Sequence, residues 1–133
     1  MSRKTLSLPA KWLHEQGLIK GDALDYGCGK GADAFLIGMD NYDPYFFPKK
    51  PTKQYETITC TYVLNVVKPI DWADLILEMM QYLAPGGTLY IAVRRDLKKE
   101  GITSKGTQQW NVQLSFPVTV EKKGKFCIYE VKK

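Results

Sequence analysis

The sequence has 133 residues, of which 44% are hydrophobic, 25% charged and 12% aromatic. This length and composition exclude an intrinsically disordered chain and indicate one globular domain over residues 1–133. The net charge of +5 is uneven, because residues 94–133 hold 10 lysines and arginines against 4 acidic residues. This basic final third leaves nucleic acid open as a partner, although a solvated loop explains the charge almost as well.

The sequence contains no apolar run of membrane-spanning length and no signal-peptide centre near its start, so we expect a cytoplasmic protein without a membrane partner. Its three cysteines, Cys28, Cys60 and Cys127, are widely separated, which predicts reduced thiols rather than a disulfide framework or a zinc site. Because His14 is the only histidine, we expect no metal centre and no histidine-activated nucleophile.

The first third of the chain alternates short helices and strands. Residues 8–16 predict a helix with Pro9 in its first turn. Residues 23–26 predict a strand that leads into a glycine-rich turn. A single helical turn is expected at residues 33–36, and a very short strand at 39–42. The proline- and lysine-containing stretch that follows is expected to be a surface connection.

The rest of the chain predicts further strands around one longer helix. Residues 56–64 are rich in β-branched side chains and predict a central strand. Asp71 is expected to cap a helix over residues 72–83, which Pro85-Gly86-Gly87 would end. Residues 88–93 predict a strand buried on both faces.

Two final strands, 108–116 and 125–131, are expected to form an antiparallel hairpin. The order of elements predicts an α/β fold that is mostly parallel. Ligand sites in such a fold lie beyond the carboxyl ends of the parallel strands.

The stretch DYGCGKG at residues 25–31 is the main candidate for a ligand-binding turn. Its glycines let the main chain approach a ligand closely and tolerate positive φ. A P-loop is excluded because Lys30 is not followed by Ser or Thr. A purely structural turn without a ligand is one alternative.

A dinucleotide is the stronger competing ligand, since Gly27, Gly29 and Ala32 satisfy the Gly-x-Gly-x-x-Gly/Ala pattern. Asp25 argues against it, because a carboxylate immediately before the turn repels a pyrophosphate. The same carboxylate attracts a cationic ligand group. S-adenosylmethionine, which carries a sulfonium and an ammonium but no phosphate, meets this electrostatic demand.

The stretch ALDYGCGKG at residues 23–31 also resembles the first motif of class I S-adenosylmethionine-dependent methyltransferases. YETITCTYVLNVV at 55–67 and LILEMMQYLAPGGTLYIAV at 75–93 resemble the later strand, helix and turn of the same fold. The resemblance covers about residues 20–96, and it implies a Rossmann-like methyltransferase with S-adenosylmethionine as cofactor and S-adenosylhomocysteine as product.

The resemblance assigns the cofactor floor, which would hold the amino-acid part of the ligand, to Asp25, Gly27, Cys28 and Gly29. An acidic residue after the second strand would bind the ribose hydroxyls. Asp43 is preferred because the Asp-Pro pair in NYDPYF resembles the end of this strand in the family, and Asp40 stays as the alternative.

The chain departs from the family pattern in one region. Eleven residues separate Gly31 from Asp43, and eleven separate Asp43 from Tyr55, too few for the family's third strand. The resemblance therefore implies a compact bacterial or viral type with a sheet order of 2-1-4-5-7-6 in family labels. Adenine contacts from the missing region would fall to Tyr45, Phe46 or residues 60–62, which adds Tyr62 to the cofactor-binding candidates.

Tyr62 and Asn65 follow the strand that faces the transferred methyl group in the family, so the resemblance makes them the catalytic candidates. Tyr62 would contact the substrate and Asn65 would orient an amine or hydroxyl. In the alternative interpretation, Tyr62 packs against the following helix and Asn65 caps a turn.

Basic residues that follow the buried strand at 88–93 are the candidates for an anionic substrate: Arg94, Arg95, Lys98, Lys99 and Lys105. The prediction is therefore methyl transfer to an unidentified acceptor, with nucleic acid or another anionic substrate open. A noncatalytic S-adenosylmethionine-binding partner or sensor protein is the alternative. For so short a chain, a homodimer in which a second copy completes the ligand pocket is one possible arrangement.

Overall fold

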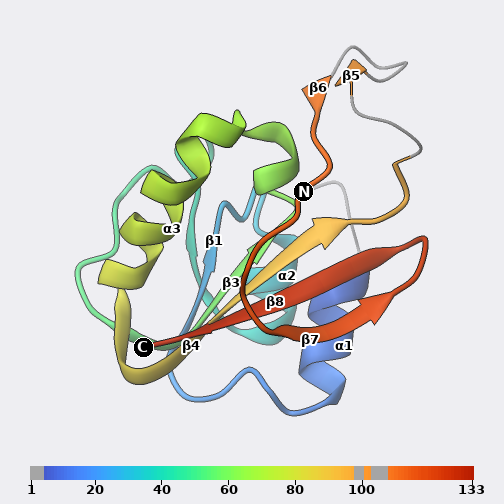
Figure 1. The fold of residues 1–133 in the computed structure, drawn as a ribbon. Coiled ribbons are helices and arrows are strands. Elements are labelled where there is room, and N and C mark those ends of the chain that lie inside the picture. Colours follow the sequence, from blue (N-terminus) through green and yellow to red (C-terminus); the bar gives the residue numbers. More distant parts are fainter. Residues whose placement is uncertain (1–4, 98–100, 103–107) are drawn as a thin grey trace.

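The computed structural model describes residues 5–97, 101–102 and 108–133. In this part of the chain, one sheet has the strand order β2-β1-β3-β4-β8-β7 (Figure 1). Its strands are β1 Ala23–Tyr26, β2 Asp40–Tyr42, β3 Tyr55–Thr61, β4 Leu83–Arg94, β7 Val118–Lys122 and β8 Phe126–Lys132. The four neighbouring strands β2, β1, β3 and β4 are parallel to one another, and β8 is antiparallel to both β4 and β7. The predicted fold class, a mostly parallel sheet with an antiparallel hairpin near the carboxyl terminus, is confirmed.

The labels used here follow the chain and therefore differ from the family labels. Between β2 and β3 the chain forms a coil connection with one isolated bridge, where the family pattern has its third strand. When β3, β4, β7 and β8 take the family labels 4, 5, 6 and 7, the observed neighbours follow the order 2-1-4-5-7-6.

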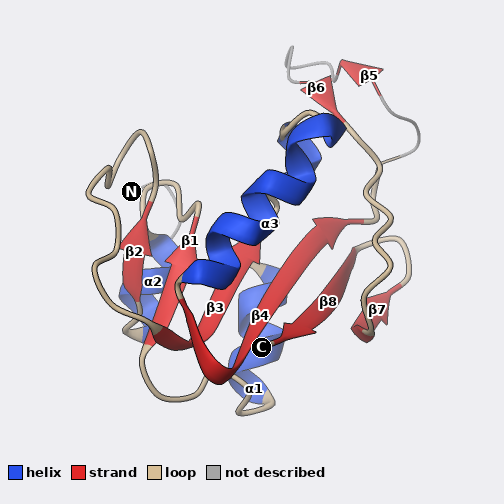
Figure 2. Cartoon of the chain, turned by 60° about the vertical axis from the view of Figure 1, so that its left-hand side comes forward, coloured by secondary structure: helices blue, strands red, loops and turns tan. Residues whose placement is uncertain are grey.

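Helices cover both faces of the sheet and create three layers (Figure 2). α3, Trp72–Gln81, lies on one face, while α1, Leu8–Glu15, and α2, Ala32–Ile37, lie on the other. The side chains of β4 alternate between these layers, as expected for a strand buried on both faces. Leu89 and Ile91 belong to the core cluster that contains Met79 of α3, whereas Tyr90 and Ala92 pack with Leu13 of α1.

Local sequence signals explain how α1 begins, but the predicted cap of α3 is wrong. Ser7 caps α1 because its Oγ accepts the N–H of Ala10, and a proline occupies the first turn. Asp71 precedes α3, but its backbone is already helical at the end of the 3₁₀ helix Pro69–Asp71 (η2), and its side chain makes no capping bond. α3 also ends at Gln81, two residues before the predicted end at 83, because Leu83 already pairs with Tyr55 in the sheet.

Two strand boundaries differ from the prediction because of backbone geometry. β3 ends at Thr61 rather than at 64, since Tyr62 has a φ of 61° and leaves the extended region. A short 3₁₀ helix, Leu64–Val66 (η1), follows. The Pro85-Gly86-Gly87 stretch lies inside β4, where the register with β3 shifts, and Gly86 has a φ of 82°.

The predicted strand over residues 108–116 is wrong. Only Gln108–Gln109 (β6) forms a strand there, and it pairs with Gly101–Ile102 (β5) as a small separate hairpin. The backbone beyond β6 bonds to side chains instead of a strand: Val112 O accepts from Arg95, and Leu114 N donates to the Tyr129 hydroxyl. The hairpin partner of β8 is β7, which starts after Pro117.

None of the helices in the described part of the chain combines the length and the apolar character needed to cross a membrane.

Candidate cofactor and acceptor site

The glycine turn leaves the carboxyl end of β1 and folds over the end of β2. The N–H groups of Gly27 and Cys28 both donate to the carbonyl oxygen of Tyr42, at 2.8 and 3.0 Å. Gly27 and Gly29 have φ values of 79° and 58°, which side-chain-bearing residues rarely adopt. A Cβ at Gly27 would lie 2.5 Å from the Val63 side chain, whereas one at Gly29 would meet nothing within 4 Å. Gly27 therefore permits close packing, while Gly29 leaves open space above the turn.

A hollow of about 350 Å³ opens where β1 and β3 end. Four of the predicted site residues line it: Asp25, Gly27, Cys28 and Tyr62. The rest of its wall consists of Ser7, Leu8, Asp33 and Thr61. Asp25 is buried, and its Oδ1 accepts a 2.9 Å hydrogen bond from Thr59 Oγ1 on the neighbouring strand. The structure thus brings these residues together around one ligand-sized space.

Asp33 is a second buried carboxylate in this hollow, and it was not among the site residues predicted from the sequence. Its two oxygens accept the Ser7 N–H at 2.9 Å and the Ser7 hydroxyl at 2.6 Å. These bonds fix the start of α1 against the start of α2. The available sequence signal was an acidic residue in the first helical turn after a glycine-rich loop, where the helix dipole favours negative charge.

Asp43 and Asp40 lie at opposite ends of β2. Asp40 pairs in register with Leu24 near the start of β1, whereas Asp43 comes directly after Tyr42 at the carboxyl end. Asp43 Oδ2 accepts the N–H of Gly29 at 2.8 Å, so this carboxylate adjoins the glycine turn. Asp40 accepts from the Tyr55 hydroxyl at 2.6 Å, away from the turn. This geometry favours Asp43 as the ribose candidate.

The segment after Asp43 presents two exposed aromatic side chains. Asp43 Oδ1 accepts the N–H groups of Tyr45 and Phe46, which shapes a tight turn. Tyr45 is 89% exposed and Phe46 50%. Flat side chains beside a ribose candidate are suited to stack on a purine, so both stay candidates for adenine contacts.

Tyr62 holds an unusual backbone conformation at the rim of the hollow. In the described residues it is the one non-glycine position with positive φ. Such a conformation costs on the order of 1–3 kcal/mol and is concentrated at functional sites. Its N–H donates to Ala92 O at 2.8 Å, which ties the end of β3 to β4. The side chain lines the hollow and also packs with the cluster around Leu13 and Phe126.

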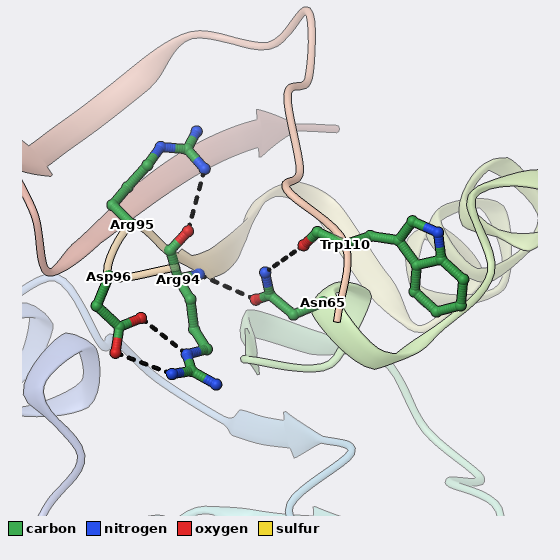
Figure 3. Close-up of polar contacts among 5 residues, drawn as sticks. All are labelled: Asn65, Arg94, Arg95, Asp96 and Trp110. Atoms are coloured by element: carbon green, nitrogen blue, oxygen red, sulfur yellow. Dashed lines mark hydrogen bonds and ion pairs between the residues drawn. The ribbon is translucent and has the colours of Figure 1, made fainter. Parts of the chain in front are cut away.

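Asn65 does not face the hollow. It is fully buried, and both atoms of its amide are bonded (Figure 3). Its Oδ1 accepts the N–H of Arg94 at 2.9 Å, and its Nδ2 donates to Trp110 O at 3.0 Å. The backbone N–H of Trp110 donates in turn to the backbone carbonyl oxygen of Asn65 at 2.8 Å. We therefore interpret Asn65 as a positioning residue that joins η1, β4 and the loop after β6, which agrees with the structural alternative for this residue.

Arg94, the last residue of β4, and Arg95, which follows it, have different roles. Arg94 forms a bidentate pair with Asp96, and Figure 3 shows these side chains on the opposite side of Asn65 from Trp110. Hydrogen bonding in this pair raises the pKa of Arg94 and lowers the pKa of Asp96. Arg95 is structural, since its guanidinium donates to Val112 O and the Tyr129 hydroxyl. Lys98, Lys99 and Lys105 lie outside the described residues.

Cys28 is a neutral thiol in this site. Burial, with further contributions from Asp25 and Asp43, raises its pKa to about 12. The thiolate is the form that attacks electrophiles and binds metals, so this side chain is unsuited to either task. Among the described residues, no group of three or more His, Cys, Asp or Glu side chains is placed to hold a metal ion.

The residues around the hollow fit S-adenosylmethionine in charge, and the glycine turn leaves room for a ligand. Within residues 5–97, 101–102 and 108–133, its lining includes two carboxylates, Asp25 and Asp33, and no lysine, arginine or histidine. A cationic ligand is therefore favoured over one that carries phosphates. The space above Gly29, which a Cβ would enter, leaves room for a ligand against the main chain.

Comparison with known proteins identifies the family. A family model described as a methyltransferase domain matches residues 3–129, so the chain belongs to the methyltransferase domain family. A search of curated proteins finds no match. The prediction of a class I S-adenosylmethionine-dependent methyltransferase is confirmed at the level of family and fold.

Solved structures share this fold at low sequence identity. A DhpI complex with S-adenosylhomocysteine has a TM-score of 0.61 and 16% identity, and the match covers 92% of this chain and 81% of that one. An S-adenosylmethionine-dependent methyltransferase from Mesorhizobium loti has a TM-score of 0.61 and 12% identity, with 93% and 98% covered.

Magnesium protoporphyrin IX methyltransferase from Synechocystis PCC 6803, with bound S-adenosylmethionine, has a TM-score of 0.57 and 13% identity, with 94% and 76% covered. Other matched chains are longer. The present chain spans 47% of an amino pentose methyltransferase from Micromonospora echinaspora and 42% of coclaurine N-methyltransferase.

Proposed function

We propose that this protein transfers a methyl group from S-adenosylmethionine to an acceptor that carries an anionic group. The observation that carries the proposal is the acidic hollow beside the glycine turn, whose lining among the described residues has two carboxylates and no cationic side chain. A sulfonium and an ammonium are stabilised in such surroundings, whereas a pyrophosphate is repelled. The basic final third of the sequence supports the anionic acceptor.

We assign the ligand contacts by position. The carboxylates of Asp25 and Asp33 face the cationic part of the ligand. The open space above Gly29 lets the ligand approach the main chain. Asp43 accepts a ribose hydroxyl, because its carboxylate has about four lone-pair sites and the turn uses three of them. Tyr62, at the rim, contacts the acceptor.

When bound, S-adenosylmethionine supplies a methyl group that is already activated by the positive sulfur. A lone pair on the acceptor forms the new bond to the methyl carbon, the carbon–sulfur bond breaks with its electrons on sulfur, and the acceptor's proton leaves to water. The chain has to align the acceptor with the methyl group and exclude water, so no histidine or thiolate is needed.

Calorimetry with S-adenosylhomocysteine and NAD tests the cofactor assignment. We expect binding of S-adenosylhomocysteine and binding of NAD at least about tenfold weaker, since the acidic lining disfavours phosphate. Asp43→Asn is expected to weaken S-adenosylhomocysteine binding about tenfold through the lost charge-assisted bonds. Asp40→Asn, the matched control at the other end of β2, is expected to change it less than about twofold.

Two outcomes would contradict these assignments. A preference for NAD would overturn the cofactor, and a larger loss with Asp40→Asn than with Asp43→Asn would move the ribose contact to Asp40. Binding without transfer from labelled S-adenosylmethionine to pools of DNA, RNA, protein and small metabolites would instead support a noncatalytic binding or sensor protein.

We also propose the cytoplasm as the compartment of this protein. Cys28, Cys60 and Cys127 all lie in the described part of the chain as free, buried thiols. Unpaired thiols persist in a reducing compartment.

A further inference from the structure

A second, smaller hollow of about 260 Å³ lies between α1 and the turn that joins β7 to β8. One wall consists of Leu8, Lys11, Trp12 and Glu15, which recur at the spacing of a single helix face. The other wall consists of Lys122, Lys125 and Phe126. We call this space the lysine groove. It combines an aromatic interior with a basic rim.

The lysines of the groove are not neutralised by ion pairs within the described residues. Salt bridges there involve other lysines: Lys50 pairs with Glu78, and Lys53 lies near Asp22 and Asp40. Lys11, Lys122 and Lys125 are exposed, and Glu15 is the one acidic residue in the lining. Three positive charges against one negative charge give the groove a net attraction for anions.

The turn that carries two of these lysines is well defined. Lys125 N donates to Lys122 O at 2.8 Å, and Gly124 has a φ of 74°, as a tight hairpin turn requires. Phe126 is only 3% exposed and packs with Leu13 of α1. The packed hairpin therefore holds Lys122 and Lys125 at a fixed place beside the helix.

The lysine groove adjoins the acidic hollow. Leu8 is 54% exposed and lines both spaces. Tyr62, at the rim of the acidic hollow, packs in the same cluster as Phe126. Phe126 is also the register partner of Arg94 at the carboxyl end of β4. A ligand in the groove thus lies on the side of the acidic hollow where Tyr62 is found.

We propose that the lysine groove binds the anionic group of the methyl acceptor, a small molecule in which a carboxylate or phosphate is joined to an aromatic body. This proposal rests on the proposed methyltransferase function. Trp12 contacts the aromatic body, while Lys122, Lys125 and Lys11 hold the anion. Carboxylates then surround the cationic cofactor, and lysines surround the anionic acceptor.

Titration with 1-naphthyl phosphate and with 1-naphthoate tests this site, with uncharged 1-naphthol as the control ligand. The full chain is saturated with S-adenosylhomocysteine, and the indole N–H resonances of the tryptophans are followed by NMR. We expect Trp12 to shift with both anions. Trp72 should stay in place, because its indole N–H already donates to Leu64 O and Val67 O.

Charge removal provides the matched comparison. The double variant Lys122→Gln/Lys125→Gln is expected to weaken anion binding about tenfold and to leave S-adenosylhomocysteine affinity unchanged. Lys20→Gln/Lys68→Gln removes two exposed lysines outside the groove and should change anion binding less than about twofold.

Equal binding of 1-naphthol or equal losses in the two double variants would overturn the proposal. A parallel loss of S-adenosylhomocysteine affinity would overturn it too, because it would assign the lysines to the cofactor. Tighter binding of a DNA or RNA oligomer that is insensitive to Lys122 and Lys125 would also overturn it. The titration is repeated without S-adenosylhomocysteine. If the parent chain fails to bind that ligand, the methyltransferase function fails, while the Trp12 shift still decides the groove.

Discussion

Gly27 and Gly29 share a left-handed backbone, but a side chain at each would have different consequences. At Gly27 a Cβ collides with Val63, so glycine is required by packing. At Gly29 the surrounding space is open, and the nearest partner is the Asp43 carboxylate that accepts its N–H. The same motif therefore contains one glycine needed by the fold and one that leaves room for a ligand.

Gly29→Ala is expected to weaken S-adenosylhomocysteine binding at least about tenfold, because the methyl group occupies the ligand's approach to the main chain. The left-handed backbone should cost about 1–2 kcal/mol in the free energy of unfolding. Gly38→Ala is a matched control, since Gly38 has a φ of 89° and open space around it at the end of α2. Calorimetry and urea unfolding should give equal stability losses but a binding loss only at Gly29; equal binding losses would contradict the assignment.

Sequence patterns predicted several site residues and missed others for physical reasons. The glycine turn and Asp25 are contiguous, so their neighbourhood is fixed by a local motif. Asp33 joins the site through a contact with Ser7, 26 positions away, which no local pattern encodes. The positive φ of Tyr62 is likewise set by the junction of β3 with β4, since tyrosine carries no preference for that conformation.

At the scale of elements, prediction succeeded where one signal dominated. β1 was predicted over its observed range, and α1 to within one residue, because a proline and a glycine mark the helix. The segment from 110 to 116 was predicted as part of a strand over residues 108–116. Its backbone instead bonds to Arg95 and Tyr129, so tertiary contacts outweighed the local pattern.

Asn65 links three of these elements, and its removal tests that role. Asn65→Ala leaves the Arg94 N–H and the Trp110 carbonyl without their partner, both in partly buried surroundings. The free energy of unfolding should fall by roughly 2–4 kcal/mol. Urea unfolding measures this loss.

Tyr62→Phe is the comparison variant, because it keeps the ring that packs with Phe126 and removes only the hydroxyl at the rim. It should lose less than about 1 kcal/mol of stability. If Asn65→Ala proved as stable as the parent, the positioning role would be wrong.

For the whole molecule, burial of titratable groups links the core to pH. Burial is the leading cause of a raised pKa in five side chains: Cys28, Tyr55, Cys60, Tyr90 and Cys127. The unfolded chain releases the thiol protons near the ordinary pKa of 9.0, whereas the folded chain retains them to higher pH. The unfolded state then binds fewer protons, so the free energy of unfolding falls as pH rises above 9.

These groups should leave the free energy of unfolding of the parent chain unchanged through neutral pH. Above pH 9, it should fall by about 1 kcal/mol per pH unit for each group that deprotonates in the unfolded state. Cys60→Ala isolates one contribution, since Cys60 is fully buried and its pKa is raised by burial and by Asp25. The variant should lose stability by a constant amount at every pH, but its profile above pH 9 should be less steep than that of the parent. Urea unfolding at pH 7.5, 9.0 and 10.5 measures both slopes, and identical slopes would contradict the link between the buried thiol and alkaline unfolding.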